Sequence, residues 1–385
     1  MIKLLTVIGA RPQIIKSAAI SRAIKNHFAS AIEEKILHTG QHYDANMSQV
    51  FFDELGIPQP CFNLGVGSGS HGVQTSKMIS GIEHVLLSEH FDGIVLYGDT
   101  NSTLAGAIAA SKIHVPVFHV EAGLRSFNMT MPEEVNRIVC DQLSSICFSP
   151  TQTGLNNLKR EGFMDSPAKF KNGKGRIVVN SGDVMYDNSM FFAPLAEQKS
   201  NILERIGVKR GEYILTTIHR PNNTDDKQRL SDILSSLILI TEHYGVTLVL
   251  PIHPRTRNLL DKNLERDVYE KLMNSSRIKL IPPASFFDII VLEKNAKIVM
   301  TDSGGVQKES FFFERPCVIL RPETEWVEIV DHGAGIIADA IPDRIVAAYD
   351  KLIGKTPSFP PLFGDAHAAE KILKTIIDYM EPLES

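Results

Sequence analysis

The sequence predicts an α/β protein with two domains, each built on a doubly wound sheet of parallel strands. Short apolar runs of strand length alternate with amphipathic stretches of helix length along almost the whole chain, a pattern typical of parallel sheets with helices on both faces. About a dozen strand-like runs are too many for one compact domain, and 385 residues are enough for two. We therefore expect two sheets, one in each half of the chain.

The first domain is expected to repeat a strand–turn–helix unit from the N-terminus onward. Apolar runs predict its strands at residues 4–8, 35–38, 93–97, 117–120 and 146–149. Amphipathic spacing predicts its helices at residues 14–26, 47–55, 73–88, 102–112 and 132–144.

The second domain is expected to continue the same alternation. Its strands are predicted at residues 177–180, 213–217, 246–250, 278–281, 298–300 and 317–320. A Lys- and Gly-rich stretch at 165–175 indicates a linker, and a proline-rich stretch at 356–364 indicates a second break. We place the domains at 1–170 and 171–364, with a last helix within 365–385 that packs back on the first domain.

Composition narrows the class of protein. A hydrophobic content of 43% and a charged content of 22% are ordinary for a soluble globular protein. A net charge of −5 without a basic tract argues against a nucleic-acid partner, and no apolar run approaches membrane-spanning length. Cysteines 61, 140, 147 and 317 lack CxxC spacing, which indicates reduced core residues rather than disulfides or a metal site. We expect a cytoplasmic protein.

The most informative stretch is Ser303-Gly304-Gly305, which lies between an apolar strand and a helix start. Glycines let the backbone approach a ligand closely, and the free amides of a helix N-terminus bind phosphate. Glu309, one turn into that helix, suits ribose hydroxyls better than phosphate. Together these residues indicate a seat for a nucleoside diphosphate with its sugar. The structural alternative is a strand–helix turn whose glycines serve close packing.

Polar side chains follow several other predicted strands, where open parallel sheets bind their ligands. The candidates in chain order are Arg11, Lys16, Asp99, Glu121, Glu133, His219 and His253. Each has a structural alternative: Arg11 and Lys16 could be solvated turn charges, and Asp99 could cap a helix. The helix dipole alone explains one of the two glutamates Glu133 and Glu134. Because polar side chains follow one predicted strand after another, a ligand-binding site is favoured over these structural alternatives.

One glycine motif suggests a different function. Residues 67–72 fit the G-x-G-x-x-G template of a dinucleotide site. No convincing strand precedes them, and no acidic residue ends a strand about twenty residues later, as that fingerprint requires. We interpret them as a loop before a helix and expect no nicotinamide cofactor.

Seven motifs occur in the order found in a known family. They are Gly9-Ala10-Arg11-Pro12 with Lys16, Gly40-Gln41-His42, Gly98-Asp99-Thr100, His119-Val120-Glu121-Ala122-Gly123-Leu124-Arg125, Pro132-Glu133-Glu134-Val135-Asn136-Arg137, His219-Arg220 and Asp302-Ser303-Gly304-Gly305. The chain thereby resembles the non-hydrolysing UDP-N-acetylglucosamine 2-epimerases over nearly its whole length. The resemblance implies a GT-B-like fold, in which two Rossmann-like domains surround a central cleft, and a homodimer.

The resemblance also implies an activity and the residues that perform it. The reaction would be reversible inversion at C2 of a UDP-linked 2-acetamido sugar for surface polysaccharide synthesis, by loss and re-addition of UDP, without metal or cofactor. Asp99, Glu121 and Glu133 would be the acid/base carboxylates, and His219 would assist the leaving phosphate. Substrate binding would fall to Arg11, Lys16, Gln41, His42, Arg137, His253, Ser303, Gly304, Gly305, Glu309 and Arg321.

Two segments depart from the typical UDP-GlcNAc pattern. Trp326 stands where an arginine is usual, and residues 126–131 replace a Thr-Gly and a longer aromatic segment. Both look more like the branch acting on UDP-2,3-diacetamido-2,3-dideoxy-glucuronate, so we expect them to select the sugar. A hydrolysing 2-epimerase, a retaining GT-B glycosyltransferase and a non-catalytic nucleotide-sugar sensor remain the alternatives.

Overall fold

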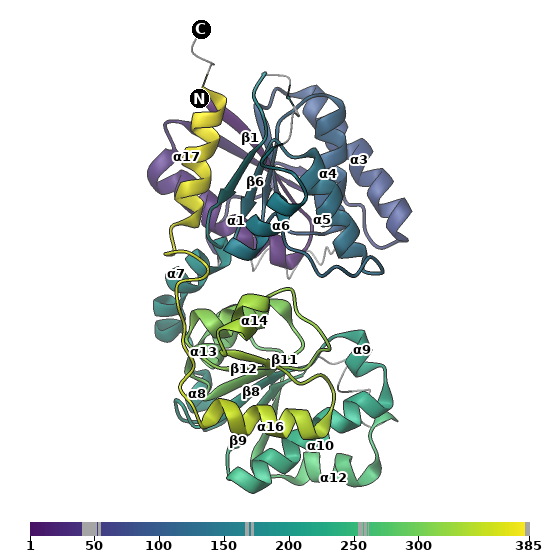
Figure 1. Ribbon diagram of the computed structural model, residues 1–385, viewed down its shortest axis with the longest axis vertical. Helices are drawn as coiled ribbons and strands as arrows, with labels where there is room; N and C mark the ends of the chain where they lie inside the picture. Colours follow the sequence, from purple (N-terminus) through teal and green to yellow (C-terminus); the bar gives the residue numbers. More distant parts are fainter. Residues whose placement is uncertain are drawn as a thin grey trace. The chain divides into compact units, whose positions relative to one another are not determined.

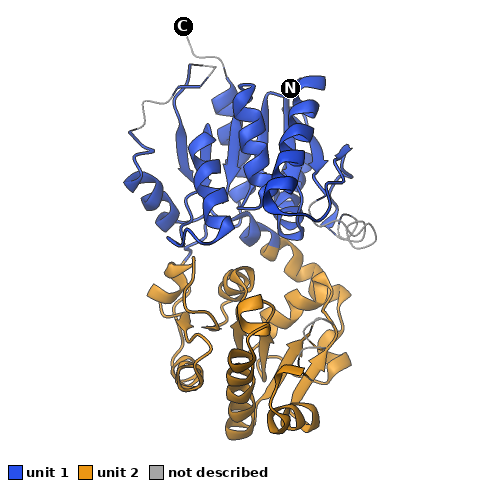
Figure 2. Ribbon diagram, turned by 90° about the vertical axis from the view of Figure 1, so that its right-hand side faces the viewer, with its two compact units in different colours: residues 1–188, 361–385 blue, residues 189–360 orange. Residues whose placement is uncertain are grey.

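The computed structural model describes residues 1–40, 52, 55–165, 169–170, 173–252, 257, 260 and 262–381. The chain divides into two compact units, residues 1–188 with 361–385 and residues 189–360 (Figure 2). The division after residue 188 differs from the expected boundary after residue 170. It lies later because β7 (Ile177–Asn180) pairs with β6 (Ile146–Ser149) and so extends the first sheet.

The sheet of the first unit has strand order β3-β2-β1-β4-β5-β6-β7 among the described residues, and all its pairings are parallel. The chain direction across the sheet reverses between β1 and β4, which makes their C-terminal ends the topological switch point, the usual ligand position in open α/β sheets. The remaining strands are β1 (Ile2–Ile8), β2 (Ile32–His38), β3 (Phe62–Asn63), β4 (Gly93–Tyr97) and β5 (Val117–Val120).

Helices cover both faces of this sheet (Figure 1). One face packs its apolar side chains, among them Leu96 and Val117, against Met78 and Ala109 of two long helices. The helices of the unit are α1 (Arg11–Ala23), the π-helical turn η1 (Ile24–Phe28), α3 (His71–Ser88), α4 (Asn101–Lys112), α5 (Pro132–Leu143), α6 (Gln152–Arg160) and α17 (Ala368–Met380).

The C-terminal helix α17 belongs to the first unit, although most of the chain separates it from the strands it covers. The carboxylate of Asp187 accepts the backbone N–H groups of Ala368 and Ala369 at 3.1 and 2.8 Å, which satisfies two free donors of the helix start. The ring of Tyr379 packs edge-on against Phe118 of β5. Asp187 lies in α7 (Val184–Lys199), the helix that crosses from the first unit into the second.

The second unit repeats the same topology with strand order β10-β9-β8-β11-β12-β13, again parallel throughout. Its switch point lies between β8 and β11. This is the strand order of a dinucleotide-binding sheet, although that order alone does not define a ligand. The strands are β8 (Tyr213–Thr217), β9 (Thr247–Pro251), β10 (Ile278–Ile281), β11 (Ile298–Thr301), β12 (Cys317–Ile319) and β13 (Gly335–Ile337).

The core of the second unit is continuous across one face of its sheet. Buried side chains such as Leu248 and Met300 pack there against Leu234 and Ile345 of the covering helices. The helices are α8 (Ile202–Ile206), α9 (Pro221–Thr224), α10 (Lys227–Tyr244), α12 (Arg266–Asn274), α13 (Phe286–Asn295), α14 (Gly304–Phe312), α15 (Val327–Asp331) and α16 (Pro342–Ile353).

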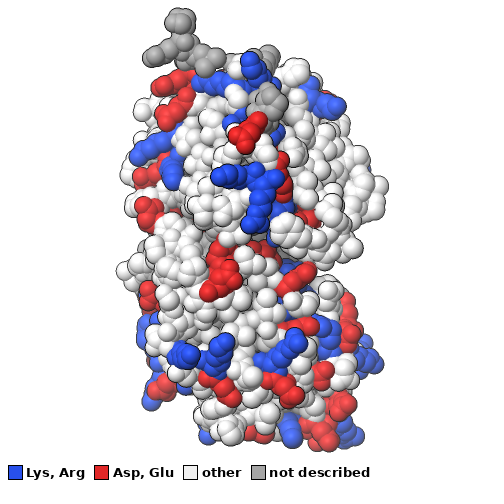
Figure 3. Space-filling view, in the orientation of Figure 1, with Lys and Arg blue, Asp and Glu red and all other residues white. Residues whose placement is uncertain are grey.

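Positive and negative side chains are interspersed over the face of the molecule shown in Figure 3. Within the described part of the chain, none of the helices has the length and apolar character that a membrane crossing requires.

Candidate active site

The switch point of the first unit places a lysine against a glutamate. Lys16, in α1, lies 2.7 Å from the Oε1 atom of Glu121, which follows β5. The two side chains are only 12% and 10% exposed. Lys16 was expected to hold a diphosphate together with Arg11. Within this unit its direct neighbour is instead the Glu121 carboxylate, while Arg11 lies exposed at the start of α1.

The turn that carries Glu121 has an unusual backbone. Glu121 has φ +76° and Gly123 has φ +82°, both in the left-handed region. Glycine occupies that region freely, but a residue with a Cβ is disfavoured there and needs support from its surroundings. Such strain gathers at functional sites, so the backbone of Glu121 supports its assignment as a site residue.

Asp99 follows β4 and meets a cation from α5. Arg137 of α5, only 5% exposed, pairs with both Asp99 and Glu134. Burial disfavours the charged guanidinium, but the two carboxylates outweigh it and raise the pKa of Arg137. The neighbouring Asn136 donates from its side chain to the backbone carbonyl of Asp99 at 2.9 Å. Helix α5 therefore fixes both the side chain and the backbone of Asp99.

The two glutamates at the start of α5 differ in environment. Glu134 is buried and accepts hydrogen bonds from the backbone N–H groups of Ser126 and Phe127. Although burial acts in the opposite sense, these N–H groups and Arg137 lower the pKa of Glu134. Glu133 is exposed. Glu134 thus holds the preceding loop in place, and Glu133 is the one open to a ligand.

Gln13 connects two turns of the site, a role that the sequence did not predict. Its side chain is buried and accepts from the backbone N–H groups of Gly9 and Ala10, at 2.9 and 3.2 Å. Its amide nitrogen donates to the Tyr97 carbonyl at 2.9 Å and to the Thr103 hydroxyl at 3.0 Å. One glutamine therefore ties the turn after β1 to the turn after β4.

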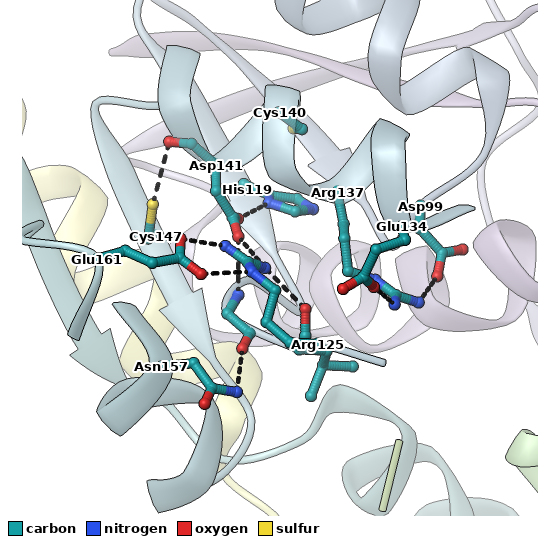
Figure 4. Close-up of polar contacts among 12 residues, drawn as sticks. Asp99, His119, Arg125, Glu134, Arg137, Cys140, Asp141, Cys147, Asn157 and Glu161 are labelled. Carbon is teal, nitrogen blue, oxygen red and sulfur yellow. Dashed lines mark hydrogen bonds and ion pairs between the residues drawn. The ribbon is translucent and has the colours of Figure 1, made fainter. Parts of the chain in front are cut away.

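A second unforeseen feature is a set of buried charges beneath the same edge of the sheet (Figure 4). His119 of β5 contacts Asp141 of α5, with Nδ1 and Oδ1 2.6 Å apart. Asp141 also pairs with Arg125 at 2.8 Å, and Arg125 pairs with Glu161. His119, Asp141 and Arg125 are all buried.

In the second unit, the switch point brings together His219 after β8 and Asp302 after β11. His219 Nδ1 lies 3.0 Å from Asp302 Oδ1, and the imidazole is half exposed while Asp302 is fully buried. Asp302 also accepts the backbone N–H groups of His219 and Arg220. Burial opposes its charge, but His219 and these donors lower the pKa of Asp302. Asp302 therefore orients His219 and leaves the rest of the ring accessible.

The turn into α14 consists of a capping serine followed by two glycines. Ser303 caps the helix through its hydroxyl, and Gly304 and Gly305 form the first residues of α14. A methyl group on Gly304 would overlap the carboxylate of Glu325, which is itself held by Arg321 at 3.0 Å. A side chain at Gly304 would therefore require the Glu325 carboxylate to move away from Arg321.

Trp326 lies behind this turn rather than open to solvent. Its side chain is 3% exposed, and the ammonium of Lys308 lies 4.2 Å from the centre of its ring. Glu309 is half buried one turn into α14. Three expected substrate contacts, Gln41, His42 and His253, lie outside the described residues. No group of three potential metal-ligating side chains is found among the residues that are described.

Residues 23–377 match the family UDP-N-acetylglucosamine 2-epimerase. The chain is 46% identical to the UDP-2,3-diacetamido-2,3-dideoxy-D-glucuronate 2-epimerase of Pseudomonas aeruginosa, over 96% of this chain and 98% of that protein. It is 44% identical to a UDP-N-acetylglucosamine 2-epimerase homolog of Methanococcus maripaludis, over 97% and 99%.

A solved structure agrees in fold. The UDP-GlcNAc 2-epimerase of Methanocaldococcus jannaschii, in complex with UDP-GlcNAc and UDP, matches with a TM-score of 0.84 and 39% identity, over 98% of this chain and all of that one. Two Rossmann-like parallel sheets of this kind make the protein GT-B-like in fold class, as expected. The chain belongs to the UDP-N-acetylglucosamine 2-epimerase family, and the family resemblance is confirmed. It is a UDP-sugar 2-epimerase, and therefore an isomerase.

Proposed function

We propose that the protein inverts C2 of a UDP-linked 2-acetamido sugar by eliminating UDP and adding it back, without hydrolysis. The observation that carries this proposal is the group of carboxylates at the first unit's switch point, in a chain of this family. Asp99 contacts Arg137, Glu121 contacts Lys16 at 2.7 Å, and Glu133 is exposed. Three carboxylates in three environments can perform different proton transfers.

The chemistry explains why more than one carboxylate is needed. The C2 proton is not next to a carbonyl and is only weakly acidic. Loss of that proton together with UDP leaves a 2-acetamidoglucal, and re-addition of UDP delivers a proton to C2 from the opposite face. Two faces require two differently placed acid/base groups. We assign these transfers to Asp99, Glu121 and Glu133.

The second unit supplies the groups that suit the leaving diphosphate. We propose that His219, oriented by Asp302 at 3.0 Å, stabilises or protonates the departing phosphate. The turn of Ser303, Gly304 and Gly305 would bind phosphate at the start of α14 through the amides of its two glycines, because the Ser303 N–H already donates to the Thr301 hydroxyl at 2.9 Å; Glu309 would bind the ribose. The remaining substrate contacts in this proposal are Arg11, Lys16, Gln41, His42, Arg137, His253 and Arg321.

For the sugar, we propose UDP-2,3-diacetamido-2,3-dideoxy-glucuronate before UDP-GlcNAc. The relative of 46% identity bears the former name, and residues 126–131 resemble that branch. Within this segment, Phe127 and Met129 are exposed beside the catalytic helix α5, where a substituent of the hexose could meet them. The four free cysteines, all in the described residues, fit a proposed cytoplasmic location, and we further propose a homodimer that serves surface polysaccharide synthesis.

Incubation with each UDP-sugar in deuterated water tests the proposal. An epimerase of this mechanism incorporates deuterium at C2 of the UDP-sugar and releases no free sugar at early times. Accumulation of free sugar and UDP would indicate a hydrolysing enzyme instead. A glycosyltransferase or a sensor would leave C2 unlabelled, and that result would refute the proposed function.

A further inference from the structure

The buried His119 ring connects the two turns that carry Asp99 and Glu121. Its Nε2 atom lies 2.8 Å from the carbonyl oxygen of Gly98, the residue before Asp99. Its Nδ1 atom lies 2.6 Å from Asp141, whose other oxygen accepts the backbone N–H of Gly123 at 3.1 Å. Gly123 follows Glu121 by two residues. The ring and the carboxylate therefore bridge the two turns.

The partners of His119 determine its protonation. A carbonyl oxygen can only accept, so Nε2 must carry a proton. Asp141 also receives the Gly123 N–H and the Arg125 guanidinium, which favour its ionised form, so Nδ1 must donate as well. A ring that donates from both nitrogens is an imidazolium.

The other charged and titratable groups around the ring are consistent with this state. Burial disfavours a charge on the ring, but the Asp141 carboxylate, 2.6 Å from Nδ1, raises the pKa of His119 well above its usual range. Against the effect of its own burial, His119 and Arg125 lower the pKa of Asp141. Two cations face two anions, because Arg125 also pairs with Glu161. Burial raises the pKa of the nearby Cys147 thiol, which stays neutral.

His119 lies at the end of the backbone pairing between β4 and β5, where sheet hydrogen bonds no longer connect the two turns. The last backbone bond between β4 and β5 runs from the Gly98 N–H to the Val120 carbonyl at 3.0 Å. Beyond it both chains turn away, with positive φ at Gly98, Glu121 and Gly123. At this point the His119 ring supplies the link that a further rung of the ladder would have provided.

We infer that His119 is a positioning residue, which as a buried imidazolium holds the Gly98 and Gly123 turns, and through them the carboxylates of Asp99 and Glu121, in their reactive geometry. The inference rests on the proposed function, since it concerns the residues assigned to proton transfer there. His119 itself touches no reacting atom in this scheme. A small shift of either carboxylate is costly, because proton transfer at carbon demands close alignment.

Two substitutions separate the two bonds of the ring. The amide nitrogen of an asparagine lies close to the position of Nδ1, and that of a glutamine close to the position of Nε2. His119→Asn therefore retains the Asp141 bond and loses the Gly98 bond, and His119→Gln does the reverse. We expect each to lower kcat by about 10- to 100-fold with KM within about twofold, since alignment rather than binding is lost.

Asp92→Asn is the matched control. Asp92 also uses its carboxylate to hold a backbone N–H, that of Lys3 at 2.7 Å, but at the opposite end of β4. This variant should lose some stability and keep its kcat. Rates are measured well below the melting temperature of each variant, and deuterium incorporation at C2 should fall in parallel with kcat. The thermal shift caused by UDP should persist in every variant.

Wild-type kcat in both folded His119 variants would overturn the inference. Should neither variant fold, histidine ¹⁵N NMR of the wild-type protein decides. At about pH 8, a histidine with both ring nitrogens protonated is expected, and its absence would overturn the inference. A wild-type enzyme that labels neither sugar at C2 would instead refute the proposed function, so the two failures are distinguishable.

Discussion

The six strands of the second unit follow the order of the first six strands of the first unit, yet the two switch points carry different side chains. In the first unit, the turns after β1, β4 and β5 hold side-chain charges in pairs, such as Lys16 with Glu121. In the second, the turn after β11 leads through a capping serine and two glycines into α14, and the buried Asp302 accepts backbone N–H groups from the turn after β8. One edge is suited to moving protons, the other to holding an anion.

The difference shows what a doubly wound sheet specifies. Topology fixes where a ligand can lie, and the residues of a few turns fix what happens there. The first unit combines a strained backbone at Glu121 with buried ions behind it, whereas the second combines a glycine turn and a capping serine with one buried carboxylate, Asp302. Substitutions at the two edges should therefore have separable effects on turnover and on nucleotide binding.

The largest expected effect is on turnover, from the first unit. Asp99→Asn, Glu121→Gln and Glu133→Gln should each lower kcat by about 100-fold or more, since each removes a proposed acid/base group. The melting temperature and the stabilisation by UDP should remain close to the wild-type values. Steady-state kinetics and thermal unfolding measure both. Near-normal turnover in all three variants would mean that the first unit's edge does not perform the chemistry.

The second expected effect is on nucleotide binding, from the second unit. Saturating UDP should stabilise the protein, by about 2.7 kcal/mol at 100 times its Kd. Gly304→Ala should weaken UDP at least about tenfold, because the new methyl group would overlap the Glu325 carboxylate at the start of α14 and crowd the anion seat.

Gly72→Ala is its control, since a methyl group there meets nothing within 4 Å. Calorimetric titration with UDP gives both affinities. Equal UDP binding by wild type and Gly304→Ala would remove the turn before α14 from the nucleotide site.

The sequence revealed most of the fold because apolar runs mark strands that are buried on both faces. It missed β3 and β13, which are two and three residues long and too short to show a period. It also began β2 at residue 35 rather than at Ile32, because the polar run before Lys35 conceals the strand. Glu34 in that run is partly buried and accepts hydrogen bonds from Thr6 and Ser21. These partners come from other elements, so local pattern could not indicate them.

The same limit applies to the site. Residues directly after strands could be picked out one by one, because parallel strands bring their C-terminal ends to one edge. His119 lies within β5, where a buried residue usually serves packing, and its partner Asp141 lies 22 residues away. Gln13 was likewise hidden as an ordinary helix residue. Which polar side chains meet in a core depends on tertiary packing, and a single sequence does not contain that information.

A smaller effect concerns Trp326, which the sequence suggested as a selector of the sugar. Because the indole is buried against Lys308, we expect Trp326→Phe to act mainly on packing, lowering the free energy of unfolding by about 1 kcal/mol. The ratio of kcat/KM for the two UDP-sugars should stay unchanged. Urea unfolding and competition kinetics test this. A shifted sugar preference would show that Trp326 helps to determine which UDP-sugar is used, so that residues 126–131 would not be the sole determinant.

The smallest expected effect is a difference in pH response between the two units. In the first unit, burial raises the pKa of Asp187 to about 6, although the N–H groups of Ala369 and Ala368 act to lower it. The folded state then binds this proton more tightly than the unfolded chain, so stability rises as pH falls from about 7 to about 5. In the second, the pKa of Asp302 is lowered, so its contribution is constant over that range and is lost only at lower pH.

Asp187→Asn and Asp302→Asn separate these two contributions. The difference in unfolding free energy between wild type and Asp187→Asn should grow by about 1 kcal/mol in favour of wild type from pH 7 to pH 5. The difference between wild type and Asp302→Asn should stay constant there and shrink below about pH 4, where the unfolded chain takes up a proton that the folded-state carboxylate does not yet bind. Urea unfolding at a series of pH values measures both. A pH-independent gap for Asp187→Asn would show that its carboxylate at the start of α17 is ionised throughout, held by the two backbone donors in spite of its burial.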